Sequence, residues 1–207
     1  MVRDGVNMKR IWTTIAWLTA MTMARAADFA TTYHFSPDLS QERNPLVYEF
    51  GGHWFSIVFI NVMVCGAIFV CAFLYCRSKP RCDLIRESSS TWDFASLLLY
   101  GSKLQRSEFL RRRMFSIKIP PKGFRAPLVH LCGFCFPPVI TGVSLLAVFA
   151  WFATRQWRLQ WFINTDNHLG ILLFLIAIVV MWSLAESIFF SSEYKRAQRF
   201  YGTPHII

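Results

Sequence analysis

The chain carries no charged side chain from Trp54 to Tyr75. An α-helix of roughly 20 apolar residues crosses a bilayer hydrocarbon core of about 30 Å. Because that core holds no water to pair with backbone amides and carbonyls, a helix, which pairs them internally, is the structure that such a run can adopt there. The sequence therefore predicts a transmembrane helix over residues 54–76.

Two later runs are also apolar enough to cross a membrane. Residues 128–153 contain Pro137-Pro138, which predicts either a kinked spanning helix or an interfacial turn followed by a shorter span. Residues 169–190 form the third run, with Glu186 as its only charge. In the whole chain 16% of residues are charged, against roughly a quarter in soluble domains. These features predict an all-α integral membrane protein, a bundle of three or four transmembrane helices plus an inner-face amphipathic helix.

The N-terminal segment, residues 1–27, permits two interpretations. Basic residues precede a short apolar stretch from Ile11 to Ala24, and Ala24-Arg25-Ala26 resembles a small-residue cleavage site. This order is typical of a secretory signal. It fits a retained short anchor equally, and a retained anchor would supply the fourth helix. Residues 28–53 then follow as an outer segment.

The distribution of charge predicts the side of the membrane on which each connection lies. Residues 77–125 hold 12 Lys/Arg and 4 Asp/Glu, whereas residues 28–50 hold one basic and four acidic side chains. Positively charged connections stay on the side from which insertion begins. We therefore expect residues 77–127 and the tail 191–207 on the inner side, and the loop 154–168 on the outer side.

The inner connection is expected to contain the amphipathic helix. Ser90 and Asp93 match a capping box, and apolar residues near helical spacing follow them. A basic amphipathic helix beside a membrane commonly lies in the interface and contacts anionic lipid. The same apolar stripe could instead dock on a partner subunit. The residues predicted to bind lipid or a partner are Lys103, Arg106, Arg111, Arg112 and Arg113.

Cysteines gather near the inner ends of the predicted spans. Cys132 and Cys135 form a C-x-x-C pair preceded by His130, and Cys76 and Cys82 lie at the same predicted border. Such a set is a candidate thiol redox or metal site. The alternative is that these cysteines fill space as small apolar side chains, with Cys76 and Cys82 open to palmitoylation. No cysteine lies in an outer segment, which excludes an ectodomain stapled by disulfides.

Two polar residues lie inside the predicted spans. Glu186 is an intramembrane acid about one turn from the inner border. It is interpreted either as part of a proton relay or as the partner of a basic group such as Lys195 in an ion pair. Asn61 lies within the first span and is expected to form an interhelical hydrogen bond.

The sequence favours a non-catalytic role without excluding an enzyme. It contains no nucleotide-binding glycine loop, no H-E-x-x-H and no G-x-S-x-G elbow. We expect a structural or accessory subunit of a larger membrane complex, with a respiratory or ATP synthase complex of the mitochondrial inner membrane as the favoured host. The alternatives are a four-span channel subunit or scaffold of the secretory pathway or plasma membrane, and a membrane thiol or metal redox protein. We expect other membrane subunits and anionic lipids as partners, no nucleic acid and no cofactor.

Overall fold

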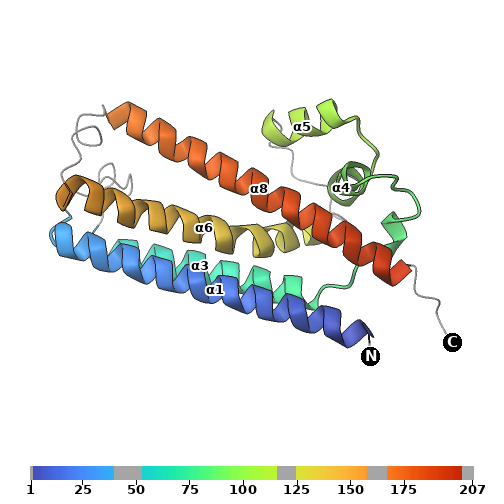
Figure 1. The fold of residues 1–207 in the computed structure, drawn as a ribbon, viewed down its shortest axis with the longest axis horizontal. Coiled ribbons are helices and arrows are strands. Elements are labelled where there is room, and N and C mark those ends of the chain that lie inside the picture. The colour runs from blue at the N-terminus through green and yellow to red at the C-terminus, as the bar shows by residue number, and fades with distance from the viewer. Residues whose placement is uncertain (1, 40–52, 116–124, 158–166, 202–207) are drawn as a thin grey trace. The chain divides into compact units, whose positions relative to one another are not determined.

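The computed structural model describes residues 2–39, 53–115, 125–157 and 167–201, which form helices and no strand. Figure 1 shows the six α-helices and the short 3₁₀-helix of this part of the chain. They are α1 (Val2–Phe35), α3 (Trp54–Arg77), η1 (Cys82–Leu84), α4 (Thr91–Tyr100), α5 (Arg106–Phe115), α6 (Arg125–Arg155) and α8 (Asn167–Tyr201).

Among the described residues, α3, α6 and α8 are long and apolar enough to cross a membrane. The 24 residues of α3 correspond to about 36 Å at 1.5 Å per residue, enough for a hydrocarbon core of about 30 Å. Large apolar side chains such as Phe55 and Val62 point outward from it. This confirms the predicted fold class, an all-α membrane protein.

Several helix ends differ from the sequence-based boundaries. Helix α6 runs unbroken through Pro137 and Pro138, so the expectation of an interfacial turn there is wrong. The carbonyl oxygen of Pro137 accepts a hydrogen bond from Thr141 Oγ1 at 2.7 Å, which pairs one polar group just after the prolines. Helix α1 continues through residues 28–35, where the sequence predicts an outer segment, and α8 extends beyond the predicted end at residue 190 to Tyr201.

The chain divides into two compact units: residues 1–70 with 136–183, and residues 71–135 with 184–207. The first unit contains α1, the N-terminal part of α3, the C-terminal part of α6 and the N-terminal part of α8 (Figure 1). Its aromatic contacts join separate helices. Phe35 of α1 stacks on Trp151 of α6 with ring centroids 5.9 Å apart, and Phe136 of α6 meets Trp182 of α8 at 5.1 Å.

Helix α1 buries threonine, alanine and methionine side chains and exposes large apolar side chains. Thr14, Met21 and Thr31 are buried at helical spacing, while Trp12 and Met23 point outward with more than 60% of their surface exposed. A helix in water shows the opposite pattern, because its apolar stripe faces the core. Among the described helices, α1 is not apolar enough to be counted as a membrane span by hydropathy alone.

The second unit contains an aromatic core. Tyr75 at the end of α3 lies with its ring centroid 5.6 Å from that of Phe134 in α6 and 5.9 Å from that of Phe189 in α8. The ring centroids of Phe134 and Phe189 are 5.5 Å apart, so all three rings contact one another. This core fixes the ends of the three long helices that the unit contains.

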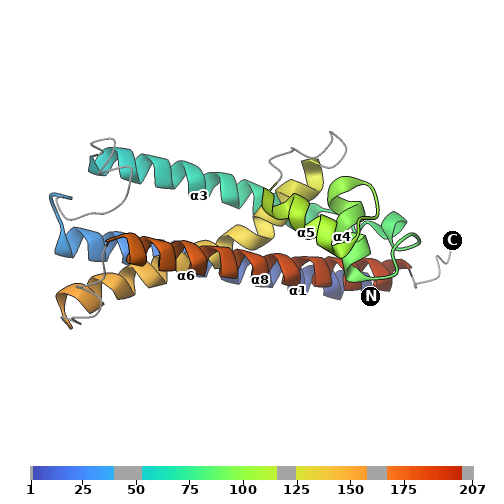
Figure 2. The same cartoon turned by 90° about the horizontal axis from the view of Figure 1, so that it is seen from above.

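Helices α4 and α5 belong to this second unit (Figure 2). Ser90 caps α4 by accepting a hydrogen bond from the Asp93 amide at 3.2 Å, as the capping-box pattern predicts, and Gly101 ends the helix with φ 70°. Residues 94–99 are all buried. Phe94 contacts Tyr194 of α8, so the apolar stripe that we expected to meet lipid or a partner packs within the chain.

Candidate functional site

Arg25 lies at the centre of a polar cluster in the first unit. Its Nη1 atom lies within hydrogen-bonding distance of Asp28 Oδ2 at 2.5 Å and of Ser144 Oγ at 3.3 Å. Its Nη2 atom donates to Asn61 Oδ1. One guanidinium from α1 therefore contacts α3 and α6 together, and its central carbon lies 5.1 Å from the Phe29 ring centroid.

The chemistry of this cluster suits the fastening of helices. A guanidinium presents five N–H donors in a fixed planar fork, so it can pair several acceptors in different directions. Side-chain exposure is 21% for Arg25 and 15% for Asp28. A charge held in apolar surroundings is stable when a counter-charge and hydrogen bonds surround it, and Asp28, Asn61 and Ser144 provide them.

The sequence-based interpretation missed Arg25 and Asp28 as partners. It treated Arg25 as part of a cleavage-like tripeptide and Asp28 as the start of an outer segment. The interhelical hydrogen bond expected for Asn61 is confirmed, with Arg25 as its donor. The available signal was the arginine–aspartate spacing of three residues, which places both side chains on one helix face.

A second buried polar cluster joins the ends of α3 and α8 in the second unit. Arg196 Nη1 donates to Glu193 Oε2 at 3.2 Å, and Arg196 Nη2 donates to the Ser78 carbonyl oxygen at 2.6 Å. The Tyr75 hydroxyl donates to Glu193 Oε1 at 3.3 Å. Both Glu193 and Arg196 are buried. The cluster thus ties the end of α3 to the last turns of α8.

Glu186 was the acid singled out from the sequence, and it lies two turns before Glu193 on α8, half-buried. The buried acid with an arginine partner is Glu193, which the sequence placed in the inner tail. Lys195, the basic partner suggested for Glu186, is exposed. The proton-relay interpretation of Glu186 stays a prediction.

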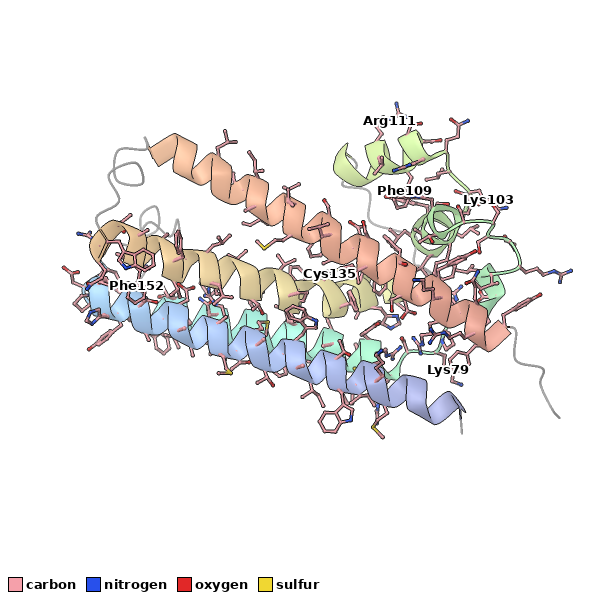
Figure 3. The ribbon with its side chains drawn as sticks, viewed as in Figure 1. Lys79, Lys103, Phe109, Arg111, Cys135 and Phe152 are labelled. Carbon is pink, nitrogen blue, oxygen red and sulfur yellow. The ribbon has the colours of Figure 1, made fainter. Side chains whose placement is uncertain are left out.

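The cysteine candidates all lie in the second unit. Among the described residues, no group of three or more His, Cys, Asp or Glu side chains is arranged to hold a metal ion. A metal or thiol role for Cys76, Cys82, Cys132, Cys135 and His130 stays a prediction. Cys135 is fully buried beside the core (Figure 3). The His130 ring lies 6.4 Å from that of Tyr75.

The glycine inside the C-x-x-C pair has a packing role. A Cβ atom added to Gly133 would overlap the carbonyl oxygen of Cys71 and lie 2.7 Å from the backbone nitrogen of Ala72. The backbones of α6 and α3 therefore touch at this position. Small residues at such contacts let membrane helices approach closely.

The basic residues predicted to bind lipid or a partner belong to α5 and the turn before it. Lys103, Arg106 and Arg111 are exposed, and the guanidinium of Arg106 lies 4.9 Å from the Trp92 ring centroid. Figure 3 shows Arg111 pointing away from the side of α5 that buries Phe109. Arg112 and Arg113 lie in α5, and their side chains are outside the described part of the chain. Binding by these residues stays a prediction.

Two carboxylates outside the spans have lowered pKa values. Hydrogen bonds from Arg81, together with its positive charge, hold the pKa of Asp83 below its usual value. The same hydrogen bonds, together with the negative charge of Asp83, raise the pKa of Arg81. The hydroxyl of Ser89 is the main cause of the lowered pKa of Asp93, whose carboxylate also accepts the Ser89 amide. Both interactions stabilise short connecting segments at the surface.

Comparison with known proteins identifies no relative. No protein family model, no curated protein and no solved structure matches this chain.

Proposed function

We propose that this protein is a non-catalytic structural or accessory subunit of a larger membrane assembly. The observation that carries the proposal is the Arg25 cluster. The guanidinium contacts Asp28, Asn61 and Ser144, which all belong to the chain's own helices. This arrangement suits holding helices together rather than catalysis. Outward faces rich in large apolar side chains leave room for lipid and for neighbouring helices.

We further propose that α1 stays attached as a fourth spanning helix. Its 34 residues correspond to about 51 Å, more than a hydrocarbon core of about 30 Å requires. Trp12, Ile15 and Met23 on its outer face suit lipid, whereas Arg25 and Asp28 on the inner face suit a polar contact with α3 and α6. Cleavage after Ala26 would separate Arg25 from all three of its acceptors.

The mitochondrial inner membrane remains our proposed location. A basic N-terminal segment retained on the inner side, and cysteines that all lie outside the predicted outer segments, suit a membrane whose inner side is reducing. A respiratory or ATP synthase complex would be a natural host. The secretory-pathway scaffold is the alternative, and it predicts removal of the N-terminal segment.

Native mass spectrometry of the protein extracted in a mild detergent tests the proposal. We expect a particle heavier than the 24.0 kDa chain that contains other, different subunits. N-terminal sequencing of the same sample should find the segment before Ala27 still attached. A single chain or a homo-oligomer would contradict the subunit role and favour a channel or scaffold, and a mature start at Ala27 would contradict a fourth span.

The proposed orientation can be tested with single cysteines in a variant whose six native cysteines are alanine. Ser102 lies between α4 and α5 and Gln156 follows α6, and both are exposed. In intact right-side-out vesicles, a membrane-impermeant maleimide added outside should label Gln156→Cys. Ser102→Cys should stay unlabelled until the membrane is permeabilised. Labelling of Ser102→Cys alone from outside would invert the topology.

A further inference from the structure

We propose that a cavity in the second unit binds a phosphate group, carried either by an anionic lipid headgroup or by free phosphate. The cavity has a volume of about 90 Å³. Its polar lining comes from Lys79, Arg81, His130 and Glu193, and Phe94 and Phe189 contribute apolar walls. All of these residues belong to one unit. Lys79 is marked in Figure 3 near the last turns of α8.

The charges of the lining favour an anion. Lys79 and Arg81 bring two positive charges to the lining. The single carboxylate of the lining, Glu193, accepts hydrogen bonds from Arg196 and Tyr75, so its charge is balanced from outside the lining. Arg81 shares its Nε and Nη2 atoms with Asp83. This ion pair is exposed to solvent, and the N–H groups on Nη1 of the planar guanidinium remain as donors for an oxyanion.

The size of the cavity suits a small oxyanion. One water needs only about 10–15 Å³ of comparable space, so about 90 Å³ holds several waters or one group with several oxygens. Phosphate oxygens accept short, strong hydrogen bonds from arginine and lysine. The aromatic walls give the cavity a non-polar side, which suits the glycerol and upper acyl region of a lipid as well.

The position of the cavity along the helices agrees with the level of lipid phosphates. Lys79 and Arg81 follow the last residue of α3, Arg77, and the lining residues Ala126 and Pro127 open α6. A helix of about 20 residues crosses the hydrocarbon core, so residues just beyond the end of a 24-residue helix fall among the headgroups. Basic pockets between transmembrane helices on the inner side are typical sites for anionic headgroups.

Lipid binding to the full-length protein in an uncharged detergent tests the proposal. The probes are phosphatidylglycerol, phosphatidylcholine and inorganic phosphate, and bound lipid is counted by native mass spectrometry across a titration. We expect the dissociation constant for phosphatidylglycerol to rise about 25-fold in Lys79→Gln/Arg81→Gln, at about fivefold for each positive charge. Weak phosphatidylcholine binding should not change.

Two matched variants separate charge in the cavity from charge elsewhere and from folding. Arg86→Gln/Lys195→Gln removes two exposed charges that do not line the cavity and should bind phosphatidylglycerol like the wild type. Lys79→Arg/Arg81→Lys keeps both charges and should retain binding. Equal losses in both glutamine variants, a loss in the charge-preserving variant, or no loss in Lys79→Gln/Arg81→Gln would each overturn the proposal.

The inorganic phosphate arm distinguishes the two sources of the phosphate group. Displacement of phosphatidylglycerol by millimolar phosphate, with the same dependence on Lys79 and Arg81, would support a site for the free anion. Persistence of the bound lipid in phosphate would support a headgroup site in which the apolar walls contribute. Both results support phosphate recognition by this cavity and differ only in its carrier.

Discussion

Arg25→Met is expected to lower the free energy of unfolding by about 3 kcal/mol, the lower end of the cost of breaking a buried ion pair. Methionine keeps much of the side-chain volume but cannot donate a hydrogen bond. The substitution would therefore leave the charge of Asp28 without the Arg25 counter-charge, and Asn61 and Ser144 without this donor. Chemical unfolding of the purified protein in detergent, followed by tryptophan fluorescence, measures the change.

The double variant Arg25→Met/Asp28→Leu discriminates a lost attraction from a stranded charge. Replacing both members of a buried ion pair with apolar groups is often neutral or stabilising, so the double variant should recover most of the loss. Lys9→Met is the matched control, because Lys9 is an exposed basic residue on the same helix. A loss in Lys9→Met as large as that in Arg25→Met would show that the polar cluster does not hold α1 in place.

The three spanning helices could be predicted from the sequence because their signal is local. Each is an apolar run long enough to cross a membrane. Such a run can be recognised without knowing which residues meet in the folded chain. The Pro137-Pro138 pair shows where local rules overreach. The expected interfacial turn does not occur, and helix α6 continues through both prolines.

The polar sites could not be predicted because they depend on tertiary contacts. Nothing in the local sequence around Arg25 states that Asn61 and Ser144, on two other helices, come within reach of it. The apolar pattern of α4 was recognised, but a pattern cannot state what covers it, and the stripe packs on α8 through Phe94. Glu193 was overlooked for the same reason, since its arginine and tyrosine partners become visible only in the folded chain.

A series of glycine-to-alanine variants is expected to give the second large effect. Gly133→Ala should destabilise the protein by about 1–3 kcal/mol, the usual cost of overpacking, because the new methyl group meets the backbone of Cys71 and Ala72 and backbone atoms cannot rotate away. At Gly142 the methyl group meets the Met181 side chain, whose flexible end can move, so a smaller loss is expected. The midpoint of thermal unfolding in detergent ranks the variants.

Gly66→Ala is the internal control, because nothing lies within 4 Å of the added atom. All three glycines lie within helices, where alanine is intrinsically favoured by about 1 kcal/mol, so differences among the variants report packing alone. Gly66→Ala should match or exceed the wild type in stability. If Gly133→Ala were equally stable, α3 and α6 would not be in backbone contact, and the glycine of the C-x-x-C pair would need a role other than packing.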